Sequence, residues 1–180
     1  MVRRSKRLSL VLRHQPALVG LELDSHGWVA VATLLDAMGR HGWPISRGEL
    51  ADVVETNDKQ RFEWDRETDR IRARQGHSVE VDLNLLVAQP PEVLFHGTAR
   101  RNVASIMRTG LERRGRHHVH LSVDVATAHG VGSRHGDPAV LQVAAAQMAR
   151  DGHEFRVSGN GVWLVQTVPP AYLTPSQDTP

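Results

Sequence analysis

Two consecutive prolines, Pro90 and Pro91, constrain the fold most strongly, because they interrupt the chain near its middle. A chain of 180 residues has room for one ordinary domain or two small ones. The segment that begins at Gln75 alternates in hydrophobicity and predicts a strand before the prolines. We therefore expect two lobes, residues 1–88 and 92–180, in a protein of the α+β class.

The first lobe has the pattern of three helices followed by a hairpin. Residues 3–14 predict a helix that Pro16 stops, and residues 31–38 predict a second, amphipathic helix. A capping-box spacing at Ser46 begins a third helix, and residues 61–74 alternate around a turn. This order is typical of a winged-helix-like lobe, a fold that is common in nucleic-acid binding but does not define a function by itself.

The second lobe is organised by residues 93–136. A short apolar strand, Val93–Phe95, ends in His96-Gly97-Thr98, where the glycine would let the backbone approach a ligand closely. After an intervening helix, residues 118–122 predict a strand with His118, His120 and Ser122 on one face. Two strands that each present a histidine and a small hydroxyl side chain indicate a polar crevice.

The rest of the second lobe is predicted to be β-rich. Residues 139–144 read as a strand, and residues 159–161 have the composition of a hairpin turn. The tail from Thr174 onward is expected to be loose.

Composition limits the classes of function. The chain has no cysteine, which excludes disulfides and Cys-ligated metals, and no run approaches 18 apolar residues. Its net charge is only +2, but 20 of its 22 basic residues are arginine. Arginine binds phosphate oxygens better than lysine does, because its planar guanidinium can donate two hydrogen bonds at once. A GC-rich genome would also favour arginine over lysine. We expect a cytoplasmic protein with no membrane association and no obligate protein partner.

Several well-known sites are missing from the sequence. It has no P-loop, no G-x-G-x-x-G motif and no H-E-x-x-H motif. The cluster of His117, His118 and His120 could bind zinc, but neither a cysteine nor a paired acid accompanies it. We therefore expect no metal.

Seven short motifs follow one another in a fixed order. They are LRHQP at 12–16, DKQRF at 58–62, IRARQGHS at 71–78, FHGT at 95–98, RHHVHLS at 116–122, VGSRHG at 131–136 and NGVWL at 160–164. In this order they resemble the NAD-dependent RNA (tRNA) 2′-phosphotransferase family, KptA type, over nearly the full length. The resemblance implies an RNA-binding first lobe and an NAD-binding second lobe with an ADP-ribosyltransferase-like fold.

The same resemblance implies a two-step reaction. An internal RNA 2′-phosphate, as in a tRNA-like substrate, attacks NAD and gives an ADP-ribosylated RNA phosphate with loss of nicotinamide. The second step leaves RNA with a free 2′-OH and ADP-ribose 1″,2″-cyclic phosphate. The catalytic tetrad of the family falls on Arg13, His14, Arg61 and Arg116. A helix dipole also favours cations on a last turn, so Arg13 and His14 have a structural explanation as well.

The resemblance also implies binding residues. Those expected to hold NAD are His96, Gly97, Thr98, His120, Ser122 and Arg134. Those expected to contact RNA are Lys59, Arg72 and His77. A structural histidine is the alternative for His120, and a solvated surface arginine is the alternative for Arg134. Two other functions remain open: an ADP-ribosyltransferase that acts on nucleic-acid ends or protein without the second step, and a non-catalytic RNA-binding module.

Overall fold

Two separate hydrophobic cores divide the chain into two units, Met1–Asn84 and Leu85–Pro180. The core of the first unit is drawn from residues between Leu8 and Ala73, and that of the second from residues between Leu94 and Leu173. The computed structural model describes residues 2–57 and 59–176. Asp58, which begins the motif at 58–62, lies outside the described residues.

Three helices form most of the first unit: α1 (Val2–Arg13), α2 (Val31–Arg40) and α3 (Arg47–Glu55). The predicted capping box begins α3: Ser46 Oγ accepts from the backbone N–H of Glu49 at 3.2 Å, and Glu49 Oε2 accepts from the backbone N–H of Ser46 at 2.9 Å. The sequence prediction of three helices at these places is confirmed.

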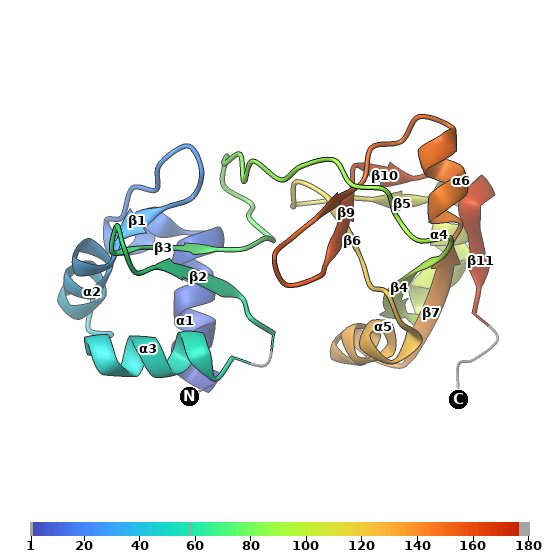
Figure 1. Cartoon of the computed structure of the whole chain (residues 1–180). Coiled ribbons are helices and arrows are strands. Elements are labelled where there is room, and N and C mark those ends of the chain that lie inside the picture. Colours follow the sequence, from blue (N-terminus) through green and yellow to red (C-terminus); the bar gives the residue numbers. More distant parts are fainter. Residues whose placement is uncertain (1, 58, 177–180) are drawn as a thin grey trace. The chain divides into compact units, whose positions relative to one another are not determined.

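A small antiparallel sheet completes the first unit, with strands β1 (Val29–Ala30), β2 (Phe62–Asp65) and β3 (Arg70–Ala73) in the order β1-β3-β2. The hairpin register pairs Trp64 with Ile71, both of which are buried. Figure 1 shows the three helices around this sheet. Helices and antiparallel strands in both units confirm the α+β class.

The second unit is built on short antiparallel sheets, in the orders β11-β7-β4, β6-β9-β8 and β10-β5. The strands are β4 (Leu94–Ala99), β5 (Leu111–Glu112), β6 (Val119–Leu121), β7 (Pro138–Val143), β8 (Arg156–Val157), β9 (Trp163–Val165), β10 (Thr167–Val168) and β11 (Leu173–Pro175). A bridge between Phe95 and Ser122 joins the first two sheets through backbone hydrogen bonds of 2.8 Å in both directions.

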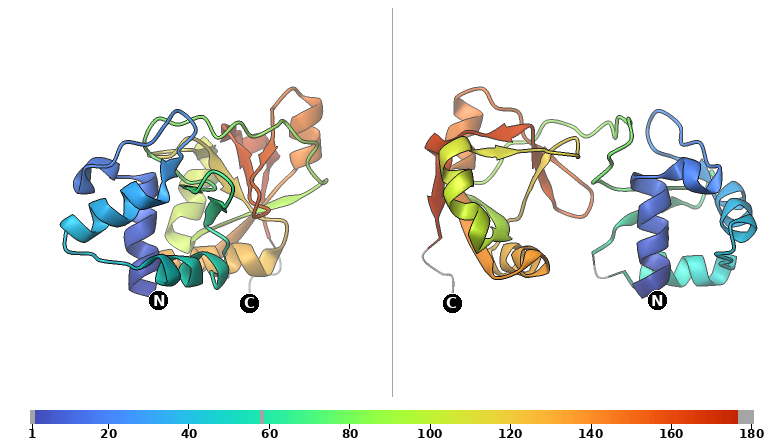
Figure 2. Two further views of the ribbon diagram at one scale, coloured as in Figure 1. Left: turned by 60° about the vertical axis from the view of Figure 1, so that its left-hand side comes forward. Right: turned by 180° about the vertical axis from the view of Figure 1, so that it is seen from behind.

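Helices α4 (Val103–Thr109), α5 (Val125–Gly132) and α6 (Ala145–Arg150) accompany these sheets. Helix α5 contacts β4 and β7, and the views in Figure 2 show it beside the ends of these strands. This helix was not predicted from the sequence. Asp124 caps it, because its Oδ1 accepts from the backbone N–H of Thr127 at 2.7 Å.

Two local predictions were wrong. The segment after Gln75 forms no strand among the described residues; its regular pairing is limited to a bridge between Val87 and Arg156. The tail from Thr174 is not loose at its start, because Leu173–Pro175 pairs with β7 as β11. Among the described residues, we find no helix with the length and apolar character needed to cross a membrane.

Candidate active site

Arg13 and His14 lie where α1 ends. The carbonyl of Arg13 accepts from the backbone N–H of Ser78 at 2.9 Å. The Nδ1 atom of the exposed His14 ring lies 3.0 Å from Ser78 Oγ. Pro16 prevents the helix from continuing, so both residues are presented at its carboxyl end. Ser78 therefore holds the backbone of one candidate catalytic residue and the side chain of the next.

Arg61 is hydrogen-bonded to Arg13 and to Asn57. Arg13 Nη2 donates to the carbonyl of Arg61 at 3.4 Å, and Arg61 Nη1 donates to Asn57 Oδ1 at 3.3 Å. Asn57 also accepts from the backbone N–H of Lys59 at 3.1 Å, and its Nδ2 donates to Ser5 Oγ at 3.0 Å. Three of the four residues of the expected tetrad are thus neighbours within the first unit.

The three expected RNA contacts differ in their surroundings. Lys59 is exposed on the turn before Arg61. Arg72 is only 17% exposed, pairs with Glu63 at 2.9 Å and lies 4.5 Å over the Trp28 ring. His77 is 2% exposed and packs against Gly27. Burial gives His77 a structural explanation beside the expected RNA contact, which stays a prediction.

His96 lies on β4 beside the strand that carries His120. His96 Nδ1 is 3.2 Å from the carbonyl oxygen of His120. A carbonyl only accepts, so Nδ1 carries the proton of this bond. Burial is the main cause that lowers the pKa of His96, and the positive charges of Arg114 and Arg116 lower it further. The hydrogen bond to the His120 carbonyl raises this pKa and so acts against them. A neutral ring with a protonated Nδ1 keeps Nε2 as a hydrogen-bond acceptor.

Arg116 approaches the same histidine pair. Its Nη1 lies 3.4 Å from His120 Nδ1, and a guanidinium only donates, so Nδ1 of His120 is the acceptor. The strand is shorter than the predicted 118–122, because β6 spans Val119–Leu121 and Ser122 directly follows it. Val119 and Leu121 are buried, whereas His120 and Ser122 are partly exposed. These side chains bring a cation, ring nitrogens and a hydroxyl to one region of the second unit.

Gly97 has a packing role that the sequence did not reveal. A Cβ at Gly97 would lie 1.7 Å from the carbonyl oxygen of Ala128 in α5 and 2.9 Å from the backbone nitrogen of Gly132. The glycine therefore permits close packing of α5 on β4, and its expected contact with NAD stays a prediction. Thr98 is 6% exposed, and its Oγ1 accepts from Asn102 Nδ2 at 3.3 Å.

Arg134 is exposed in the 3₁₀ turn Ser133–His135, which follows α5 directly. This position agrees with either of the two alternatives, an anion contact or a solvated surface arginine.

The donor set of the second unit suits a dinucleotide better than a metal ion. Ribose hydroxyls need both donors and acceptors, which His96, His120 and Ser122 supply, and pyrophosphate needs cations such as Arg116. Within residues 2–57 and 59–176, no group of three or more histidine or acidic side chains could hold a metal ion.

Sequence reasoning did not assign Asn57 or Ser78 to the site. Ser78 stands 64 positions from His14, so no local periodicity connects the two residues. The only available signal was its place at the end of the motif at 71–78. Asn57 precedes a turn, where asparagine is common for local reasons, and this hides its contact with Arg61.

Comparison with known proteins places the chain in a family. Residues 1–167 match the RNA 2′-phosphotransferase, Tpt1 / KptA family. A protein of Nostoc punctiforme is 53% identical over 173 residues, covering 96% of both chains. One of Streptomyces griseus is 54% identical over 179 residues, covering 96% of this chain and 95% of the relative. Both relatives carry the name "Probable RNA 2'-phosphotransferase". The chain therefore belongs to the RNA 2′-phosphotransferase family of transferase enzymes.

Proposed function

We propose that this protein removes an internal 2′-phosphate from RNA and transfers it to NAD. The observation that carries the proposal is made in a member of this family: Arg13 donates to the Arg61 carbonyl, and Ser78 contacts both the Arg13 carbonyl and the His14 ring. The first unit would be a winged-helix-like RNA-binding lobe, and the second an ADP-ribosyltransferase-like lobe that binds NAD.

The proposed reaction has two steps. An oxygen of the RNA 2′-phosphate forms a bond to C1 of the nicotinamide ribose while the bond to nicotinamide breaks, which gives an ADP-ribosylated RNA phosphate. The neighbouring ribose 2-hydroxyl then bonds to phosphorus while the bond from phosphorus to the RNA 2′-oxygen breaks. The hydroxyl proton ends on that oxygen, and the products are nicotinamide, 2′-OH RNA and ADP-ribose 1″,2″-cyclic phosphate.

The arginines would act on the phosphate charges. The nucleophile is already an anion at neutral pH, so the first step mainly requires that the repulsion between RNA phosphate and NAD pyrophosphate be reduced. In the second step, negative charge passes through phosphorus, where fixed guanidinium groups stabilise the transition state. We assign this role to Arg13 and Arg61 of the first unit and to Arg116 of the second.

His14 would move the proton in the second step. Histidine titrates nearer to neutral pH than any other side chain, so it can accept a hydroxyl proton and return it to a leaving oxygen. The contact of Nδ1 with Ser78 Oγ orients the ring, and the proposed proton transfer uses Nε2.

The remaining proposed residues bind the two substrates. His96 Nε2 would accept a hydrogen bond from a ribose hydroxyl of NAD, and His120 and Ser122 would contact the same dinucleotide. Arg134 would contact an NAD phosphate, while Gly97 and Thr98 support this site through packing. Lys59 would meet the RNA backbone, and so would Arg72, whose guanidinium lies over the Trp28 ring.

The test is incubation of the full-length protein, with and without NAD, with a short RNA that carries one internal 2′-phosphate. Products are resolved by mass, alongside those of His14→Ala, His14→Asn and Arg61→Ala. Asparagine can keep a hydrogen bond to Ser78 but cannot transfer a proton at neutral pH. Arg40→Ala is the matched control, because Arg40 is exposed on α2 and pairs only with Asp36 among the described residues.

We expect NAD-dependent loss of the phosphate, with the cyclic ADP-ribose phosphate as co-product. Both His14 variants and Arg61→Ala should accumulate ADP-ribosylated RNA, whereas Arg40→Ala should behave as the unaltered protein. A wild-type reaction that stops at ADP-ribosylated RNA would favour the one-step ADP-ribosyltransferase. RNA binding without nicotinamide release would favour the non-catalytic module.

A further inference from the structure

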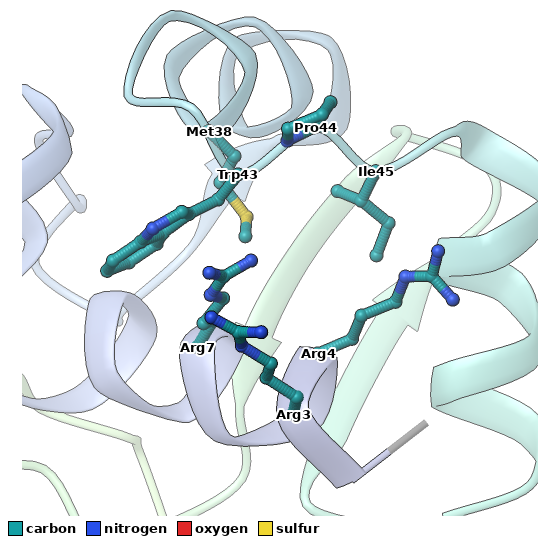
Figure 3. A pocket seen from close by; sticks show the side chains of 7 residues that line it. All are labelled: Arg3, Arg4, Arg7, Met38, Trp43, Pro44 and Ile45. Carbon is teal, nitrogen blue, oxygen red and sulfur yellow. The ribbon is translucent and has the colours of Figure 1, made fainter.

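A pocket of about 350 Å³ lies in the first unit between the amino-terminal half of α1 and the segment that follows α2 (Figure 3). Its lining combines three cations with apolar side chains: Arg3, Arg4, Arg7, Met38, Trp43, Pro44 and Ile45. None of these residues belongs to the site described above. The lining contains no acidic residue, so its charge is positive.

Two of the three guanidinium groups are directed into this pocket. Arg4 turns toward α3, where it pairs with Glu49. Arg3 makes no hydrogen bond or ion pair with any described residue. Arg7 lies 4.8 Å over the Trp43 ring, which fixes its position. Arg3 and Arg7 are four positions apart on α1, so their side chains leave the same face of the helix, and both line the pocket (Figure 3). Two like charges therefore share this space.

The position of these cations on α1 adds a second unfavourable interaction. The amino-terminal end of a helix carries partial positive charge, so cations there are disfavoured. Helix α1 has no acidic residue in its first turn and instead carries Arg3, Arg4, Lys6 and Arg7 in its first two turns. An anion bound in the pocket would offset both this interaction and the repulsion between Arg3 and Arg7.

Phosphate fits the pocket better than a nucleobase does. Trp43 is the obvious stacking platform, but Arg7 already covers its ring, and His41 packs edge-on at 4.5 Å between ring centroids. A base would have to displace one of these contacts. Two adjacent guanidinium groups, one of them held by an aromatic ring, are instead suited to the oxygens of a phosphodiester.

The location on α1 points to the RNA strand as the source of this phosphate. Arg3 lies in the first turn of α1 and His14 directly follows its last residue, Arg13. Their separation of 11 positions corresponds to roughly 16 Å along the helix axis. With the rise of one strand in a DNA double helix, about 3.4 Å per phosphate, as the scale, this distance corresponds to about five nucleotides. A strand whose 2′-phosphate lies at His14 can therefore pass over the pocket without leaving the first unit.

We propose that the pocket formed by Arg3, Arg7 and Trp43 binds a backbone phosphate of the RNA substrate, several nucleotides away from the 2′-phosphate. This inference rests on the proposed function, because it assumes that RNA is the substrate. It assigns a length preference to the enzyme: RNA that reaches the pocket binds more tightly than RNA that covers only the residues around His14.

The test measures binding of the full-length protein without NAD to two RNAs that each carry one internal 2′-phosphate. One has a single nucleotide on either side of it, and the other has ten. Arg3→Ala is the main variant, because Arg3 has no intramolecular bond to lose among the described residues. Arg3→Ala/Arg7→Ala is the second, and Arg40→Ala is the control with the same change in charge.

The long RNA should bind roughly fivefold more weakly to Arg3→Ala than to the unaltered protein. In the double variant, the affinity for the long RNA divided by that for the short RNA should fall toward one. The salt dependence of long-RNA binding should become shallower, by about one unit in log–log slope for each arginine that no longer neutralises a phosphate. Arg40→Ala should match the unaltered protein. Long-RNA affinity and salt slope in both pocket variants equal to those of Arg40→Ala would overturn the inference.

Two parallel measurements separate this inference from the proposed function. NAD affinity is measured for each variant. If the pocket variants lose affinity for NAD and keep their affinity for RNA, the pocket binds the pyrophosphate of NAD and the inference is overturned. Turnover with NAD is measured on the long RNA. Turnover without length-dependent binding would remove the pocket but leave the proposed function intact. RNA binding that depends on Arg3 but is accompanied by no turnover would support the pocket and contradict the proposed function.

Discussion

The backbone of Ala128 occupies the space that a side chain on Gly97 would need, since a Cβ there would lie 1.7 Å from the Ala128 carbonyl oxygen. This contact joins β4, which carries His96, to α5. A second contact works in the other direction, because a Cβ on Gly132 would lie 2.7 Å from the carbonyl oxygen of Thr98. The strand and the helix can pack this closely only because both positions lack a side chain.

Gly97→Ala should therefore destabilise the second unit. The obstructing atom is backbone, so it cannot rotate away, and we expect a loss of about 3 kcal/mol or more. In a domain of this size, that loss lowers the midpoint of thermal unfolding by more than about 10 °C. Calorimetry on the full chain would measure the effect.

The matched control is Gly130→Ala, on the same helix. A Cβ at Gly130 meets nothing within 4 Å, and alanine is a better helix former than glycine by about 1 kcal/mol. We expect Gly130→Ala to unfold at the same temperature as the unaltered protein or at a higher one. Equal melting of the two variants would contradict our account of the contact between β4 and α5.

Ser78→Ala should slow the reaction by releasing the His14 ring. Ser78 is a positioning residue, so kcat should fall roughly tenfold while KM for RNA changes little. Ser78→Thr keeps the hydroxyl and should restore most of the rate. Ser78→Ala keeps the backbone N–H that bonds to the Arg13 carbonyl. An unchanged kcat would therefore mean that the Ser78 hydroxyl does not position His14.

Asn57 provides a test of how Arg61 acts. Asn57→Ala removes the acceptor for Arg61 Nη1 and should lower kcat by releasing the guanidinium. Asn57→Asp keeps an acceptor but places a negative charge against Arg61, which offsets the charge that the reaction would use. If Arg61 stabilises phosphate charge, the aspartate variant should be slower than the alanine variant in single-turnover assays. The opposite order would indicate that only the position of Arg61 matters.

The parts of the fold that were predictable depend on local signals. The helices of the first unit were found because buried residues recur at helical spacing in α1 and α2, and because Ser46 and Glu49 form a capping box. Helix α5 was missed because its sequence, VATAHGVG, contains two glycines and buries only Ala128 and Gly132. The capping residue Asp124 was the signal that could have revealed it.

The site was predictable only in part, for a related reason. A motif identifies residues such as Arg13 and His14, but it does not say what surrounds them. The role of Gly97 depends on Ala128, which is 31 positions away, and the support of His14 depends on Ser78, at an even greater separation. Glycine in a strand is explained equally well by a ligand and by packing until the second backbone is placed.

The stability of the second unit should decrease below neutral pH, in part because of His96. Burial is the main cause that lowers the pKa of His96 in the folded protein, and burial likewise lowers the pKa of His118. The unfolded chain, with histidine at its ordinary pKa of about 6.5, then binds protons at a higher pH than the folded chain. The contribution of these two histidines to the free energy of unfolding is therefore fully present above about pH 6.5. It is lost as the pH falls toward their lower pKa values in the folded protein.

His96→Asn tests this assignment, because the asparagine amide can still donate to the His120 carbonyl but does not titrate. Thermal unfolding of the variant, followed from pH 8 to pH 5, should show a shallower loss of stability in acid than that of the unaltered protein. His118→Asn should remove its own share, and the double variant should be flatter than either single variant. An acid-induced loss of the same size in His96→Asn and in the unaltered protein would show that His96 is not buried as a neutral ring.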